Sequence, residues 1–197
     1  MNYKNNIRSR IQSGKLSTRI LKAKEKQQLL DEVNRSKPLT LMGIRQLALV
    51  CRHAGEAHDE ELLHAIRDHV GLQGHITVDI ITIIQGLFRP TRRGAEKITR
   101  ALADFLFDLN EVVADSEHNH DSWGPFFSKM VSKHLLEDSE KPNEINEEEA
   151  NWLIERVLSD GQYDYVEQVL LPMLDERAKK MPETLKFQIE LLNGTMA

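Results

Sequence analysis

The fold of this chain is decided by residues 95–113, which read AEKITRALADFLFDLNEVV. Their apolar residues recur at intervals of three and four, which is the spacing of one face of an α-helix. The residues of this stripe are Ala95, Ile98, Leu102, Phe105, Leu109 and Val113. Pro90 and Gly94 precede the stripe and mark a break in the chain. The stretch therefore predicts an amphipathic helix that begins after this break.

The rest of the chain repeats this helical spacing. Separate apolar faces lie within residues 41–51, 62–70, 123–135, 150–157 and 166–174. The β-branched residues of 76–87 would suit a strand, but a lone strand has no partner to pair with, so we expect a buried helix there. The sequence thus predicts an all-α bundle of about seven or eight helices.

Three aromatic residues, Trp123, Phe126 and Phe127, lie close together on one of these faces. The opposite face of the same segment carries Ser128, Lys129 and Lys133, as contact with water requires. Clustered aromatic side chains with a polar face behind them are typical of a core. We therefore expect the three rings to be buried.

Charge divides the chain unevenly. The net charge of the whole chain is −5, yet residues 1–30 carry eight basic side chains against Glu25 alone. We therefore separate a basic N-terminal segment, residues 1–35, from a single helical domain over residues 36–197. The basic segment leaves four interpretations open: a nucleic-acid-binding arm, a membrane-surface helix, a transit peptide, or a solvated tail or first helix.

Basic side chains would supply the phosphate contacts if the chain binds nucleic acid. The candidates lie in the N-terminal segment and around Pro90: Lys4, Arg8, Arg10, Arg19, Lys22, Arg89, Arg92 and Arg93. The N-terminal segment carries no Trp or Phe on which bases would stack. Binding through it would therefore rest on phosphate contacts and would be sensitive to salt.

An acidic glycine turn lies between the last two predicted faces. If Gly161 occupies the sixth position of an EF-hand loop, then Asp160, Asp164 and Glu167 fall on its fifth, ninth and twelfth positions. These three residues are candidate ligands for a weakly bound Ca²⁺ or Mg²⁺, although the first and third positions of the loop lack oxygen ligands. A second interpretation is a capping box, with Asp164 as the N-cap and Glu167 three residues later.

Two other groups of side chains have the spacing of metal ligands. The first comprises Glu60, His64 and Asp68, which would share one helix face. The second is a polar loop that contains Asp115, Glu117, His118, His120 and Asp121. Both groups also fit ordinary exposed surface, because exposed helices and loops are commonly polar.

The motifs of common enzyme classes are missing from the sequence. It contains no Gly-rich phosphate loop, no dinucleotide fingerprint and no serine elbow. The pair His58-Asp59 occurs in metal phosphohydrolases, but here no second His lies at a suitable distance in the sequence. We therefore expect a protein that is not an enzyme.

Cysteine content and hydropathy indicate the compartment. The single Cys51 excludes an internal disulfide and is compatible with the reducing cytosol. No apolar run approaches the roughly 20 residues that cross a bilayer, and no apolar signal-peptide region follows the basic start. We expect a cytoplasmic protein without a membrane span.

Several stretches in the second half of the chain resemble a known bacterial family. They are residues 107–113, Ser122-Trp123 with Phe126-Phe127, and residues 134–136, 149–153 and 160–167. Over roughly residues 90–190 the chain resembles uncharacterised bacterial helical proteins that are related to the tellurite-resistance TerB family. The resemblance implies an all-α fold, an association with stress or tellurite resistance, and divalent metal held by acidic residues beside such turns.

Together these patterns favour a cytoplasmic, TerB-like helical interaction module. It would bind a partner protein, be associated with stress, and hold a divalent ion weakly. The alternative is a nucleic-acid-associated protein that uses the basic N-terminal segment. A metal-dependent hydrolase is the second alternative.

Overall fold

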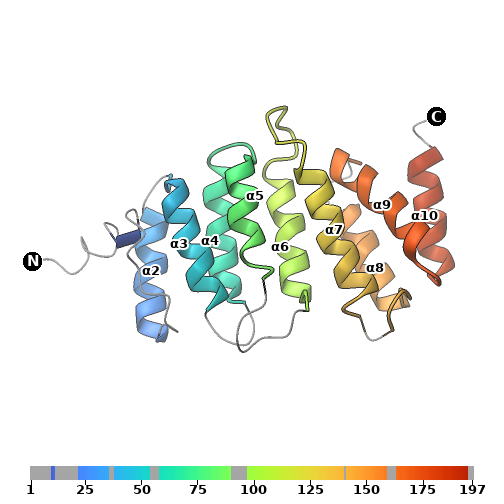
Figure 1. The fold of residues 1–197 in the computed structure, drawn as a ribbon, viewed down its shortest axis with the longest axis horizontal. Helices are drawn as coiled ribbons and strands as arrows, with labels where there is room; N and C mark the ends of the chain where they lie inside the picture. Colours follow the sequence, from blue (N-terminus) through green and yellow to red (C-terminus); the bar gives the residue numbers. More distant parts are fainter. Residues whose placement is uncertain are drawn as a thin grey trace, which may run out of the picture. The chain divides into compact units, whose positions relative to one another are not determined.

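A computed structural model of the protein describes residues 10–11, 22–35, 38–53, 58–89, 97–139, 141–158 and 163–194. The helices in these ranges are α2 (Ala23–Arg35), α3 (Leu41–Arg52), α4 (Glu60–Gly71), α5 (Val78–Gln85), α6 (Arg100–Glu111), α7 (Trp123–Leu136), α8 (Glu147–Val157), α9 (Tyr165–Arg177) and α10 (Glu183–Gly194) (Figure 1). Across the same ranges, β-pairing is limited to one isolated bridge between Glu144 and Lys180.

The prediction of an all-α fold is confirmed. The described parts of the chain contain nine helices, where the sequence analysis expects seven or eight. The helices without a predicted apolar face are α2 and α10. In α2 only Leu29, Leu30 and Val33 are buried, and the remaining residues of that helix are charged or polar, apart from Ala23. Its core-facing side is thus too narrow to stand out from the basic segment around it.

The chain divides into two compact units. The first consists of Met1–Glu96 with Asp108–His120, and the second of Lys97–Phe107 with Asp121–Ala197. The division falls within α6. The expectation of one helical domain over residues 36–197 stays a prediction, because a compact unit need not fold by itself.

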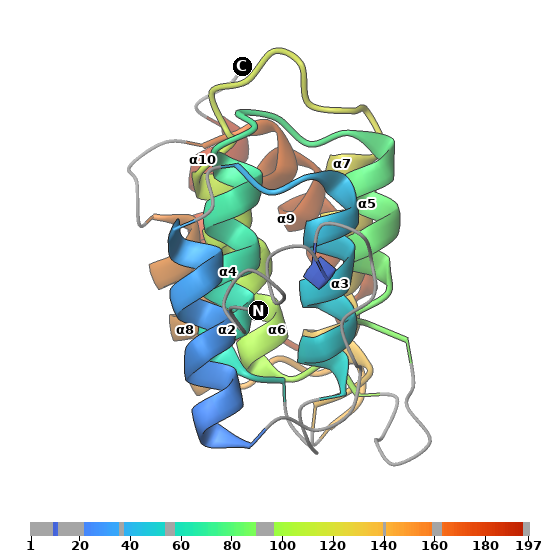
Figure 2. The same ribbon diagram turned by 90° about the vertical axis from the view of Figure 1, so that its left-hand side faces the viewer.

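In the first unit, α2 packs against α4, and α3 packs against both α4 and α5. Figure 2 shows α2 and α4 on one side of this unit and α3 and α5 on the other. Residues buried between these helices are Ile44 and Leu47 of α3, Leu62 and Ile66 of α4, and Ile80 and Ile84 of α5. The β-branched stretch that would suit a strand is therefore the helix α5, as predicted. It is buried on one side only, at Ile80, Ile81 and Ile84, because Val78, Asp79 and Thr82 are exposed.

Side-chain caps fix where three helices of the first unit begin. Thr40, Asp59 and Thr77 each accept a hydrogen bond from the backbone N–H of the third residue that follows. Such caps satisfy N–H groups that have no partner within the helix. The first residues of α3 and α5 are thus determined by hydrogen bonds to neighbouring side chains.

In the second unit, α7 and α9 form the closest helix pair, and α10 packs against α8 and α9. Small residues of α7 allow this approach: Gly124 lies under the ring of Tyr165, where an added Cβ would come within 2.6 Å of Cε1. Ser128, which the sequence places on the water-facing side, is instead buried, because its Oγ donates a hydrogen bond to the carbonyl of Val166 at 3.3 Å. Gly124 and Ser128 are one helical turn apart, so together they form a narrow strip that receives α9.

The aromatic cluster is part of the core of the second unit, as predicted. Trp123, Phe126 and Phe127 are all buried. The Phe107 ring meets the Phe127 ring edge to face, with centroids 5.0 Å apart. This arrangement is favourable for aromatic pairs and fixes α6 residues against α7.

Among the described helices, none has both the length and the apolar character that crossing a bilayer requires.

Candidate functional site

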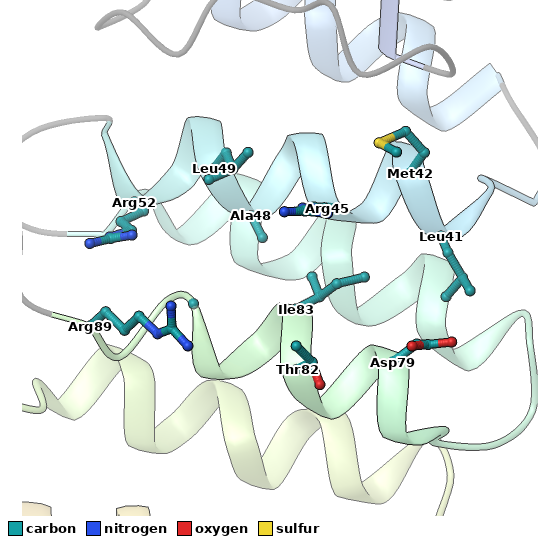
Figure 3. A pocket seen from close by; sticks show the side chains of 11 residues that line it. Leu41, Met42, Arg45, Ala48, Leu49, Arg52, Asp79, Thr82, Ile83 and Arg89 are labelled. Atoms are coloured by element: carbon teal, nitrogen blue, oxygen red, sulfur yellow. The ribbon is translucent and has the colours of Figure 1, made fainter.

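A groove between α3 and α5 is the candidate functional site. It lies within the first unit and has a volume of about 340 Å³. The residues that line it are Leu41, Met42, Arg45, Ala48, Leu49 and Arg52 of α3, Asp79, Thr82 and Ile83 of α5, and Gly86 and Arg89 at the end of α5 and beyond (Figure 3). Because α3 and α5 run in the same direction in Figure 3, the groove is bordered by two parallel helices.

The apolar part of the groove comes from a second face of α3. The first face, which includes Ile44, Leu47 and Cys51, is buried in the core. Beside it, Leu41 and Met42 remain 38% and 42% exposed. Large apolar side chains with this exposure, gathered in a concave surface, are typical of interaction sites.

Arginine side chains give the groove a basic character. Arg45 and Arg52 come from α3 and Arg89 from the segment after α5, and among the described residues of the lining Asp79 is the one that is acidic. In Figure 3, Arg52 and Arg89 lie at one end of the groove, and Leu41 and Asp79 at the other. The groove is thus basic at one end and apolar towards the other.

Two of these arginines are available for an incoming anion. Within the described parts of the chain, neither Arg45 nor Arg89 takes part in an ion pair or side-chain hydrogen bond, whereas Arg52 has an interaction of its own. A guanidinium group presents planar, paired donors that match a carboxylate or a phosphate. An anionic ligand could therefore bind Arg45 and Arg89 without first breaking an internal contact.

The α7–α9 pair of the second unit contrasts with this groove. There, α7 presents the small residues Gly124 and Ser128 to its neighbour. In α3, the residues that border the groove include the long side chains of Arg45, Leu49 and Arg52. Long side chains hold the facing surfaces of two helices apart.

A second cavity, of about 380 Å³, lies in the other unit. Its lining includes Lys141 and Lys180 together with Glu144, Glu147 and Glu149. Because basic and acidic side chains alternate there, the cavity offers no consistent charge to a ligand. The groove of the first unit is therefore the stronger candidate.

The predicted basic contacts are only partly within the described residues. Lys4, Arg8, Arg19, Arg92 and Arg93 lie outside them. Of the other three, Arg10 is half-buried, Lys22 is exposed, and Arg89 lines the groove. The nucleic-acid role of this set stays a prediction.

Sequence reasoning missed Arg45 and Arg52. The signal that could have found them is the series Met42, Arg45, Leu49 and Arg52, whose intervals of three, four and three define a second face of the same helix. The neighbouring apolar face is sufficient to predict the helix, so the spacing of this second face is easily overlooked.

The acidic turn is described only in part. Asp160 and Gly161 lie outside the described residues. Asp164 Oδ1 accepts hydrogen bonds from the backbone N–H groups of Val166 at 2.9 Å and Glu167 at 3.2 Å. In return, Glu167 Oε2 accepts one from the N–H of Asp164 at 3.0 Å. The capping box is thus formed, and it uses two of the three proposed metal ligands.

Formation of the capping box neither supports nor excludes a metal site at Asp160, Asp164 and Glu167, so that site stays a prediction. Glu167 is 5% exposed, so its carboxylate faces the start of α9 more than the solvent.

In the described ranges, no group of three or more His, Cys, Asp or Glu side chains is arranged to hold a metal ion. That result covers Glu60, His64 and Asp68, which therefore do not form the site that their spacing suggests.

The part of the polar loop after α6 that belongs to the first unit forms structural hydrogen bonds. Asn119 Oδ1 accepts a hydrogen bond from the N–H of Ile76 at 2.8 Å, and Asn119 Nδ2 donates to the carbonyl of Val113 at 2.7 Å. The N–H of His120 donates to the carbonyl of Ile76 at 2.8 Å. These bonds fix the loop against the turn that precedes α5.

The residues around the enzyme-like pair His58-Asp59 also have structural roles. His58 Nε2 lies 2.9 Å from the carbonyl of Leu87, and burial lowers the pKa of the imidazole. Asp59 caps α4 and forms an ion pair with Lys26 at 3.0 Å. Burial raises the pKa of the Cys51 thiol to about 12, so the reactive thiolate is scarce at neutral pH.

Comparison of the chain with protein-family models, with curated proteins and with solved structures returns no match. The resemblance to the TerB family therefore stays a prediction.

Proposed function

We propose that this protein is a helical interaction module whose groove between α3 and α5 binds an amphipathic helix of a partner protein. The partner helix would carry apolar side chains for Leu41 and Met42, and acidic side chains for the arginines. The observation that supports this proposal most directly is the combination, in one groove, of exposed apolar side chains with Arg45 and Arg89.

The apolar contacts would supply most of the affinity. Burying one side chain of the size of Leu or Met contributes about 1.5–3 kcal/mol. Met42 is also flexible and polarisable, so it adapts to ligands of different shape. A helix that lies along a groove through residues spaced by three and four is a common mode of peptide recognition.

The arginines would supply orientation and selectivity. Carboxylates of the partner would meet Arg52 and Arg89 at the basic end of the groove, while the apolar end would meet Leu41. A partner of the opposite polarity would place its acids near Asp79 and would be disfavoured. The groove thus distinguishes both the charge and the direction of a helix.

The lining favours a protein ligand over nucleic acid. A nucleic-acid groove combines continuous basic residues with aromatic side chains on which bases stack. Here the basic residues flank apolar ones, the described residues of the lining include no Phe, Tyr or Trp, and Asp79 would repel phosphate. The stress association and divalent-ion binding that the TerB resemblance implies would be properties of the same module.

Photo-crosslinking tests the proposal. A photoreactive phenylalanine analogue in place of Met42 would be activated in cells that produce the full chain, with the exposed Glu60 of α4 as the control position. We expect a discrete protein adduct from position 42 and none from position 60. Arg45→Glu with Arg89→Glu should abolish the adduct, while Arg67→Glu, outside the groove, should not. Equal adducts from both positions, or an adduct to nucleic acid, would contradict the proposal.

A further inference from the structure

The last helix carries a surface that complements the groove, and we infer that α10 of a second copy of this chain binds between α3 and α5. Copies would then associate head to tail. This inference rests on the proposed function in one respect, because both use the same groove. It names one occupant, an identical chain, which can be tested with the purified protein.

The outer face of α10 is apolar and exposed. Phe187 is 65% exposed and Leu191 is 49% exposed. On the opposite side of the helix, Leu185 and Ile189 are buried and hold α10 in its unit. Among the described residues, Phe187 and Leu191 are the one pair of exposed large apolar side chains that are four positions apart. They form a ridge that would insert into a groove.

Two carboxylates share this face. Glu183 lies four residues before Phe187 and Glu190 lies three residues after it, which places all three on one side of the helix. Both glutamates are exposed. Glu183 pairs with Lys186 at 2.8 Å, but ion pairs this exposed contribute little and are readily exchanged.

The spacing of charges on the two surfaces is the same. Arg45 and Arg52 of α3 are seven residues apart, and so are Glu183 and Glu190 of α10. Seven residues span about 10.5 Å along a helix. An α10 helix aligned with α3 would therefore place one carboxylate at Arg45 and the other at Arg52, which would share the interaction that it already has. Phe187 would lie over Ala48 and Leu49, the apolar lining residues between the two arginines.

The two surfaces differ, so the contact is heterologous. The groove belongs to the first unit and α10 to the second. A contact between unlike surfaces leaves one free groove and one free α10 on each growing assembly, so association continues as the protein concentration rises. A symmetric dimer would instead use one surface twice and would stop at two copies.

Sedimentation velocity of the purified chain tests the inference. Wild-type protein should associate as its concentration rises from the micromolar to the submillimolar range. The association should weaken at high salt, because the ion pairs would be exposed at the edge of the contact. Phe187→Glu and Arg45→Glu should each abolish it. Leu72→Ser is the matched control, since Leu72 is an exposed apolar residue of neither surface, and it should associate like the wild type.

A mixing experiment identifies the two surfaces. Met42→Glu would block the groove and leave α10 intact, while Phe187→Glu would block α10 and leave the groove intact. Each variant alone should be monomeric, and an equal mixture should form a one-to-one dimer that does not grow. Circular dichroism of each variant should match the wild type, since both positions are exposed.

Several results would overturn the inference. They are a wild type that is monomeric at every concentration, a Phe187→Glu variant that still associates, or a mixture that stays monomeric. None of these results decides the proposed function, because the photo-crosslink from position 42 to a different protein is measured separately. Loss of that crosslink together with normal self-association would instead contradict the proposed partner and leave the inference intact.

Discussion

Replacing Asp164 with alanine should destabilise α9 by a predictable amount. The Asp164 side chain accepts hydrogen bonds from the N–H groups of Val166 and Glu167, at 2.9 and 3.2 Å. Alanine leaves both donors without that acceptor. Loss of an N-cap typically costs about 1 kcal/mol and at most about 2 kcal/mol. For a chain of this length, each kcal/mol corresponds to about 2–4 °C in the melting temperature.

The conservative variant Asp164→Asn separates the hydrogen bonds from the charge. Its side-chain amide would keep an acceptor oxygen for the same two N–H groups but would lose the negative charge near the start of the helix. That charge contributes about 0.3–1 kcal/mol at the N-terminus of a helix. Thermal melts with a chelator present should therefore place Asp164→Asn between the wild type and Asp164→Ala. An asparagine variant as unstable as the alanine variant would refute the hydrogen-bond explanation.

Calcium separates capping from ion binding at the same turn. If Asp160, Asp164 and Glu167 hold an ion, calcium at ten times its Kd would stabilise the wild type by about 1.4 kcal/mol. Because the capping box already uses the carboxylates of Asp164 and Glu167, capping alone predicts the same melting temperature in chelator and in millimolar calcium or magnesium. A rise with calcium that Asp160→Ala removes would show that the capping explanation is incomplete and would confirm the metal prediction.

The burial of single side chains gives three further predictions. Trp123→Ala should lower the free energy of unfolding by about 3–5 kcal/mol, measured in urea, because the ring is buried; a loss below about 1 kcal/mol would contradict its place in the core. Burial lowers the pKa of His58 and of His134 in the folded protein, so below the ordinary histidine pKa the unfolded chain binds protons more readily than the folded one. The free energy of unfolding should therefore fall as the pH drops below that value. His134→Gln should make this fall smaller in thermal melts between pH 7 and about pH 5. Met42→Ser should change the free energy of unfolding by less than about 0.5 kcal/mol, because Met42 is exposed; a larger loss would make it a core residue.

The sequence predicts those parts of the fold whose signals are local. Residues 62–70 and 123–135 form α4 and α7 because their apolar spacing coincides with burial. The start of α8 follows from Asn146 and Glu149, which form the capping box that their spacing indicates. In each case the residues that decide the structure lie within a few turns of one another.

Helix α10 escaped prediction because its apolar residues do not mark one face. Leu185 and Ile189 are buried, while Phe187 and Leu191 are exposed, so apolar residues occur on both sides of the helix. A pattern of this kind is ambiguous between helix and strand when only the sequence is considered. The stretch 95–113 shows a smaller discrepancy: its helix begins at Arg100, directly after Thr99, whose Oγ1 accepts a hydrogen bond from the N–H of Leu102 at 3.4 Å.

The candidate site could not be predicted because it depends on which helices pair. Arg45 and Arg89 are 44 positions apart in the sequence, and only the packing of α3 against α5 brings them to one groove. Proximity along the chain groups Arg89 with Arg92 and Arg93. Packing places it instead with the arginines of α3.

The two helix pairs show how side-chain size decides between a core contact and a binding surface. Gly124 and Ser128 expose little side chain, so α9 approaches α7 closely enough for a serine hydroxyl to reach a backbone carbonyl. The border of the groove on α3 instead includes the longer side chains of Arg45 and Leu49, and long side chains keep the facing surfaces of two helices apart. The groove between α3 and α5 therefore remains a surface that a further helix would fill under the proposed function.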